Sequence, residues 1–142
     1  MSSIKIPYRK INFLSPLVQD YVSESTELSS FYGRYNTIDS FRNQMEEKSQ
    51  FSIDRKTLVD VLKKQNQSID LSDLTQSNIE SLESTDTFTI TTGHQLCIFT
   101  GPLYFIYKIV STINLSLALK EKYPSKHFVP VFWLASEDHD FD

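Results

Sequence analysis

The most constraining feature of this chain is a change of hydrophobic period in its C-terminal part. Residues 88–92 are aromatic and β-branched, a composition that predicts a strand. From Pro102 to about Tyr123 the apolar residues follow a helical period, and proline suits the first turn of a helix. Residues 127–134 are almost entirely apolar, as expected of a parallel strand covered on both faces, with Trp133 in the core. Strand, helix and strand predict one βαβ unit with a right-handed crossover.

Residues 1–87 have a different character and predict a lead-in of short amphipathic helices. The signals for helix ends are the N-cap pair Ser15-Pro16, the C-cap Gly33, the N-cap Asp54 and a start near Thr75. The apolar residues expected to line the later helices are Leu58, Val61, Leu62, Ile79 and Leu82. We therefore expect two parts, a helical segment 1–87 and a βαβ segment 88–142.

The composition excludes several classes of protein. The chain has 142 residues and a single cysteine, so a disulfide scaffold is excluded. No apolar run approaches the length of a membrane span, and the N-terminus has no apolar signal region, so we expect a cytoplasmic protein without a membrane partner. A net charge of −4 does not favour a nucleic-acid partner.

Two parallel strands do not make a domain, because a parallel sheet is normally covered on both faces. The sequence also ends within a cluster of ionisable residues. We therefore expect this chain to be a fragment of a longer protein, or its missing part to be supplied elsewhere.

Two polar clusters follow the two predicted strands. Residues 92–95 follow the first strand, and residues 136–140 follow the second. Ligands of an open α/β sheet bind beyond the carboxyl ends of its strands, and the predicted helix start at Gly101-Pro102 points its free N–H groups toward the same crevice. The candidate cofactor-binding residues are Thr92, Gly93, His94, Gly101 and Pro102.

These clusters match none of the standard phosphate-loop motifs. The Walker A loop, GxGxxG and the GxSxG of hydrolases are all absent. Several alternatives stay open: His94 as a helix cap or as a partner of a backbone carbonyl, Cys97 as a small buried residue, and residues 137–140 as a solvated loop or half of a metal site. The sequence leaves open whether a metal takes part.

The quoted residues resemble a known family. The block TTGHQLCIFTGPLYFIYKIVSTINL, the later HFVPVFWLASEDHDFD, and the N-terminal IPYRKINFLSPLVQDYV and FYGRY resemble the bacillithiol biosynthesis cysteine-adding enzyme family. The resemblance implies the first βαβ unit of a Rossmann-like, nucleotidyltransferase-type parallel sheet, here incomplete, behind N-terminal helices. TGHQ then stands where related enzymes keep a HIGH-type signature. The implied reaction joins L-cysteine to the amine of glucosaminyl malate after activation by ATP.

The resemblance also implies roles for residues. His94 and Gln95 are expected to contact phosphates, while Asp138, His139 and Asp140 bind substrate or a metal ion or act as general base. Full-length members are expected to continue with the rest of the sheet and with a C-terminal coiled coil through which they form homodimers. Because the chain lacks the rest of the sheet and any second nucleotide motif, it is expected to be inactive alone. The alternatives are a generic nucleotide-binding module and a non-catalytic fragment that serves folding or assembly.

Overall fold

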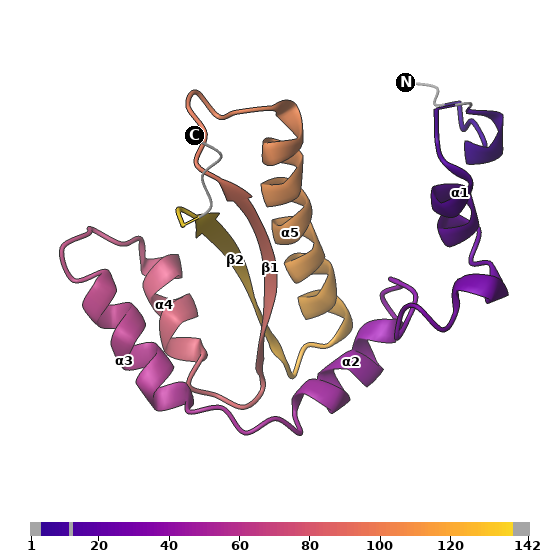
Figure 1. Ribbon diagram of the computed structural model, residues 1–142. Helices are drawn as coiled ribbons and strands as arrows, with labels where there is room; N and C mark the ends of the chain where they lie inside the picture. Colours follow the sequence, from indigo (N-terminus) through magenta and orange to yellow (C-terminus); the bar gives the residue numbers. More distant parts are fainter. Residues whose placement is uncertain (1–3, 12, 138–142) are drawn as a thin grey trace. The chain divides into compact units, whose positions relative to one another are not determined.

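The computed structural model describes residues 4–11 and 13–137 and contains both helices and a parallel sheet (Figure 1). By its internal contacts the chain divides into two compact units, Met1–Glu46 and Glu47–Asp142. The elements are η1 (Tyr8–Lys10), α1 (Pro16–Val22), η2 (Thr26–Leu28), α2 (Ser40–Lys48), α3 (Arg55–Gln65), α4 (Asp73–Ser81), β1 (Thr87–Gln95), α5 (Leu103–Lys122) and β2 (His127–Ala135). The contacts group α3 and α4 with the sheet, and the compositional boundary near residue 87 stays a prediction.

The predicted βαβ unit is confirmed. β1 and β2 pair in parallel, in a register that runs from Thr87 opposite His127 to Gln95 opposite Ala135. β1 is longer than predicted, because Gly93, His94 and Gln95 continue the strand instead of forming a loop. His94 is therefore held by the sheet ladder and not by a loop.

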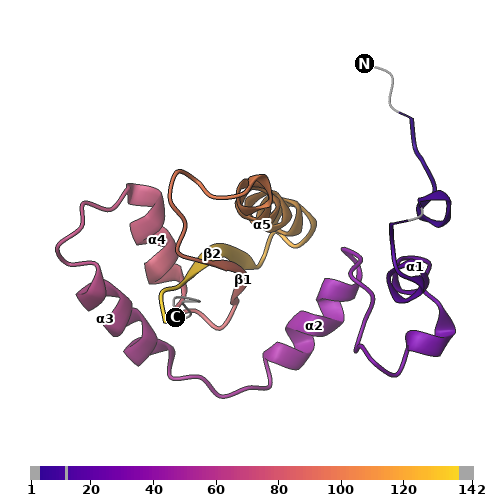
Figure 2. The ribbon, with the colours of Figure 1, turned by 45° about the horizontal axis from the view of Figure 1, so that its top comes forward.

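Helices cover both faces of this two-stranded sheet (Figure 2). On one face, Val59 of α3 and Leu82 after α4 form a buried core with Val129 of β2. On the other face, the ring of Phe105 in α5 packs edge-on against Phe132, with centroids 5.2 Å apart. Alternate residues of β2 thus serve the two layers, as the pleat of a strand requires.

Two of the predicted helix starts, at Ser15 and Asp54, are confirmed by their caps. The Ser15 side chain accepts a hydrogen bond from the Val18 N–H at the start of α1, and Asp54 accepts one from the Thr57 N–H at 3.0 Å. Ser72 performs the same task for α4. Side-chain oxygens satisfy N–H groups that the first turn of a helix leaves free, which is why these short signals are readable in sequence.

Three predictions about buried or terminal residues are wrong. Gly33 does not end a helix: η2 ends at Leu28, and Gly33 lies in a bend without a positive φ. Leu58 and Val61 are 40% and 45% exposed, because α3 turns Val59 toward the sheet instead. Trp133 is 59% exposed, since it lies further along β2 than the residues that α3 and α4 cover.

The amino end of β1 is anchored by polar contacts. The Arg55 guanidinium donates to the Leu82 carbonyl at 2.9 Å and to the Thr87 carbonyl at 3.2 Å. Thr87 is 1% exposed, and its hydroxyl donates to the Ser81 carbonyl at 2.6 Å. Beside it, the Lys126 ammonium hydrogen-bonds Asp86 and so holds the pKa of that carboxyl below its usual range.

Helix α5 is unusual in that its buried side carries hydroxyls. Thr112 and Ser116 are buried together with Leu119, and their hydroxyls donate to the helix's own carbonyls of Lys108 and Thr112. Its apolar residues Tyr107 and Leu117 are more than half exposed.

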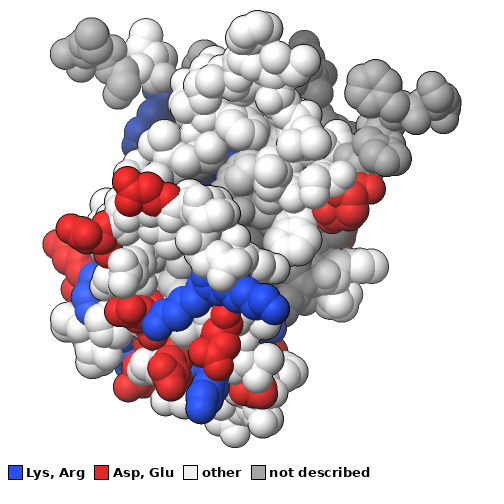
Figure 3. All heavy atoms as spheres, turned by 90° about the vertical axis from the view of Figure 1, so that its left-hand side faces the viewer, with Lys and Arg blue, Asp and Glu red and all other residues white. Residues whose placement is uncertain are grey.

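The face made by α3 and α4 carries charge of both signs. Figure 3 shows acidic and basic side chains interleaved on this side of the molecule. One such pair joins the two helices, with Lys63 Nζ 3.5 Å from Glu80 Oε1. In the part of the chain that the structure describes, no helix is long and apolar enough to cross a bilayer.

Candidate functional site

His94 lies near the carboxyl end of β1 and is held through both of its ring nitrogens. Its Nδ1 is 2.9 Å from the carbonyl oxygen of Gln95, and its Nε2 is 2.9 Å from the hydroxyl of Tyr104. The ring is partly buried. These two contacts fix its plane and its direction at the end of the sheet where ligands of α/β proteins bind.

Helix α5 brings Tyr104 and Lys108 to this histidine. Tyr104 is in the first turn of α5, and its ring centroid is 5.4 Å from that of His94. Lys108, one turn later, donates from Nζ to the Gly93 carbonyl at 3.1 Å and lies 5.4 Å from the Tyr104 ring centroid. The site therefore holds an imidazole, a phenol and an ammonium group on two adjoining elements.

Sequence reasoning missed Tyr104 and Lys108 because both were counted only as parts of the amphipathic helix. The signal that could have found Lys108 is its charge, which interrupts an apolar run between Leu103 and Val110. A spacing of four residues places both side chains on one face of the helix. In the structure this cation contacts the Gly93 carbonyl of the TGHQ segment and the ring of Tyr104.

Aromatic side chains pack against the ring of His94. Phe105 lies between His94 and Phe132, with ring centroids 5.5 Å and 5.2 Å away. Both contacts are edge-on, the arrangement that aromatic rings prefer. The His94 ring is thus packed on one side by core aromatics while its nitrogens contact polar groups.

The loop between β1 and α5 folds back on His94. Cys97 Sγ lies 3.1 Å from His94 Nδ1 and 3.4 Å from the Gln95 carbonyl oxygen. Phe99, Thr100 and Gly101 have φ angles of 52°, 68° and 61°, three left-handed residues in succession. A Cβ atom at Gly101 would lie 2.8 Å from Cys97, so both its φ and its surroundings require glycine. Cys97 is partly buried, which agrees with the prediction of a small packed residue only in part.

Gly93 is required for a different reason. A Cβ atom there would lie 2.9 Å from the carbonyl oxygen of Trp133 in the neighbouring strand. Gly93 has no positive φ, so its role is the close approach of the two strands. This packing leaves the Gly93 carbonyl available to Lys108.

The structure places part of the predicted site and not the rest. Gly93, His94 and Gln95 lie at the end of β1, Gly101 lies in the loop before α5, and Pro102 is the N-cap residue of α5 instead of its first helical residue. Thr92 lines a cavity of about 160 Å³ between the sheet and α5. Asp138, His139 and Asp140 lie outside the described residues.

The turn after β2 provides one further contact. The Trp133 indole N–H donates to Glu137 Oε1 at 3.3 Å. Within residues 4–11 and 13–137, His, Cys, Asp and Glu side chains form no group of three that could hold a metal ion.

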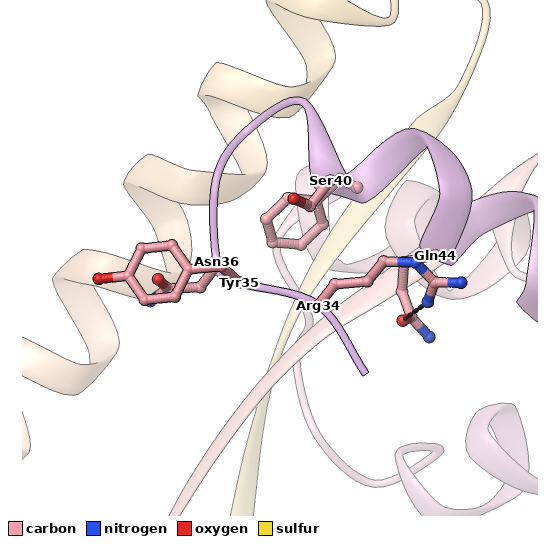
Figure 4. A pocket seen from close by; sticks show the side chains of 6 residues that line it. Arg34, Tyr35, Asn36, Ser40 and Gln44 are labelled. Carbon is pink, nitrogen blue, oxygen red and sulfur yellow. Dashed lines mark hydrogen bonds between the residues drawn. The ribbon is translucent and has the colours of Figure 1, made fainter. Parts of the chain in front are cut away.

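A second cavity lies in the unit Met1–Glu46 (Figure 4). It has a volume of about 160 Å³ and is lined by residues of the FYGRY segment, by the following Asn36 and by residues of α2. Arg34 donates to Gln44 Oε1 at 3.0 Å across it, as the dashed line in Figure 4 marks. Tyr35 points away from that pair and donates to the Val22 carbonyl, and desolvation with the nearby Glu24 raises the pKa of its hydroxyl.

Comparison with known proteins gives a consistent result. A family model described as "Bacillithiol biosynthesis BshC, N-terminal Rossmann-like domain" matches residues 1–142. Proteins named "Putative cysteine ligase BshC" from Christiangramia forsetii and Flavobacterium johnsoniae are each 53% identical to this chain over 96% of its length. A protein of the same name from Bacillus cereus is 35% identical over 89% of the chain. The chain spans about a quarter of the length of these relatives, 26% in the two former cases.

Proposed function

The chain belongs to the BshC family of bacillithiol biosynthesis as its N-terminal Rossmann-like domain, and we propose that it forms the ATP-binding part of a cysteine ligase. The reaction would join the carboxyl group of L-cysteine to the amine of glucosaminyl malate. An amide does not form readily from a free carboxylate in water, so the carboxylate must first be activated. Adenylation by ATP, as in other nucleotidyltransferase-type enzymes, would provide that activation.

The observation that carries this proposal is the meeting of His94, Lys108 and the start of α5 at the carboxyl end of β1. Charge develops on phosphate oxygens during adenylyl transfer, and fixed donors stabilise it most in a partly desolvated site. The Lys108 ammonium donates to a backbone carbonyl and contacts the Tyr104 ring. A bound phosphate would offer it a stronger, charge-assisted partner.

Further roles follow for the remaining predicted residues. Gln95 would hydrogen-bond a phosphate beside His94. Thr92, Gly93 and Pro102 would shape the nucleotide site, and the turn at Gly101 would let N–H groups at the start of α5 face the phosphates. Asp138, His139 and Asp140 would bind the substrate amine, the ribose or a metal ion, or serve as general base. The whole protein would be a cytoplasmic homodimer with L-cysteine and glucosaminyl malate as its partners, and this domain would be inactive alone.

The test is exchange of labelled pyrophosphate into ATP, measured in the full-length protein with and without L-cysteine. Adenylation predicts exchange that depends on cysteine and needs no glucosaminyl malate. His94→Ala should lower the exchange rate at least about a hundredfold, because it removes a transition-state donor. Lys108→Gln should lower it as well, through weaker ATP binding.

Lys56→Gln is the matched control, because Lys56 is an exposed lysine of α3 at the other end of the sheet. It should leave the exchange rate unchanged. Ligation at the wild-type rate by His94→Ala would contradict the site. ATP binding without cysteine-dependent exchange would indicate a generic nucleotide-binding module instead.

A further inference from the structure

The contacts of His94 determine which of its nitrogens carries the proton. Nδ1 is 2.9 Å from the Gln95 carbonyl oxygen, which has no proton to donate. A hydrogen bond at this distance therefore requires the proton on Nδ1. In the neutral ring, Nε2 is then the acceptor.

The acceptor Nε2 faces the hydroxyl of Tyr104. This hydroxyl lies 2.9 Å from Nε2, and a phenol can donate to a lone pair. The Cys97 sulfur at 3.1 Å from Nδ1 is consistent with the same tautomer, since sulfur is a weak acceptor. Both ring nitrogens thus have partners that agree on one proton position.

Tyr104 is itself held in place. It lies in the first turn of α5, and the Lys108 ammonium is 5.4 Å from its ring centroid. Lys108 in turn donates to the carbonyl of Gly93, the residue before His94. The phenol and the imidazole are therefore joined through two routes, one direct and one through Lys108.

We propose that Tyr104 is a positioning residue that holds His94 as its Nδ1–H tautomer, with Nε2 covered by the phenol hydroxyl. This inference rests on the proposed function, in which His94 meets the phosphates of ATP. In this arrangement the neutral His94 has no N–H directed toward a ligand from Nε2. A phosphate oxygen that approaches there meets the Tyr104 hydroxyl. His94 can donate to that oxygen from Nε2 only after the hydroxyl has turned away and Nε2 has taken up a proton.

The primary test is solid-state NMR of the full-length protein labelled with ¹⁵N-histidine, with His94 assigned from the spectrum that His94→Asn lacks. Wild-type His94 should show a protonated Nδ1 and an unprotonated Nε2 that accepts a hydrogen bond. Tyr104→Phe keeps the ring and removes the hydroxyl, so the Nε2 signal should move downfield toward that of a free acceptor. Tyr107→Phe is the control, because Tyr107 is on the same helix and 62% exposed; it should leave the His94 signals in place.

Kinetics give the second readout. Tyr104→Phe should lower kcat about tenfold or more and leave KM for ATP nearly unchanged, because orientation and not binding is lost. A protonated Nε2 in the wild type, or His94 signals that Tyr104→Phe does not move, would overturn the inference. The NMR readout does not depend on ligase activity, so a failure of the proposed function leaves it standing, and a failure of the tautomer assignment leaves the ligase proposal untouched.

Discussion

The two ends of β1 are built in opposite ways. At the amino end, Thr87 is 1% exposed; its carbonyl accepts from Arg55 and its hydroxyl donates to the Ser81 carbonyl. At the carboxyl end, His94 is only partly buried, and its ring contacts Tyr104, Gln95, Cys97 and Phe105. One end of the strand provides stability, and the other leaves polar groups within reach of a ligand. Substitutions at the two ends should therefore have separable effects.

The largest effect on stability is expected at the buried end. Leu82→Ala should lower the free energy of unfolding by about 3 kcal/mol, because it leaves a cavity between Val59 and Val129. Urea unfolding followed by circular dichroism measures this loss. Leu74→Ala, on α4 but 71% exposed, is the control and should change the free energy by less than about 0.5 kcal/mol.

The emission of Trp133, the chain's single tryptophan, gives a second readout on Leu82→Ala. Under native conditions the emission should be unchanged, because Trp133 lies beside the carboxyl end of β1. A shift of the native emission in Leu82→Ala would mean that the amino and carboxyl ends of β1 are coupled. It would contradict the expectation that substitutions at the two ends have separable effects.

A smaller loss is expected from the polar anchor. Arg55→Met should cost about 2 kcal/mol, because the carbonyls of Leu82 and Thr87 each lose a charged donor in partly buried surroundings. Lys56→Met changes the next residue, which is exposed, and should be close to neutral. If both variants lowered the free energy of unfolding equally, the hydrogen bonds of Arg55 would not contribute to stability.

The smallest effect concerns the exposed pair of Asp86 and Lys126. Hydrogen bonding and charge from Lys126 lower the pKa of Asp86 in the folded state, so the pair stabilises the fold above the unfolded pKa, near 4. That contribution is lost as pH falls through the lower, folded pKa. Exposure keeps it small, because water screens the pair.

The pH dependence of the urea midpoint tests this pair. Between neutral pH and about pH 3, Asp86→Asn should lose less stability than the wild type. Asp54, whose pKa the Thr57 N–H lowers, titrates in both proteins and serves as the internal reference. Parallel pH profiles would show that the pair contributes nothing to acid stability.

Local signals explain why much of the fold could be predicted from the sequence. The caps Ser15, Asp54 and Ser72 act within one helical turn, although only the first two were recognised. The βαβ unit follows from hydrophobic period alone. The sequence could not predict which face of α3 is buried. The helix has two apolar faces, and only packing against the sheet selects one of them; the residues concerned are Leu58, Val59, Val61 and Leu62.

The candidate site could be predicted only where it is contiguous in sequence. The end of the predicted strand indicated the segment from Gly93 to Gln95, which in the structure forms the last residues of β1. Tyr104 and Lys108 reach it through the crossover of α5, a contact that no local pattern encodes. The roles of Asp138, His139 and Asp140 stay predictions, since those residues lie outside the described part of the chain.

The buried hydroxyls of α5 have a mechanical consequence. The hydroxyls of Thr112 and Ser116 donate to carbonyls of their own helix. At these positions the contact between α5 and the sheet is therefore non-directional packing. The hydrogen bonds from Tyr104 and Lys108 join the first turns of α5 to β1. A sliding motion of α5 along the sheet would thus strain the bonds around His94 before any at Thr112 or Ser116. The contacts of the candidate site therefore also hold α5 in its position along β1.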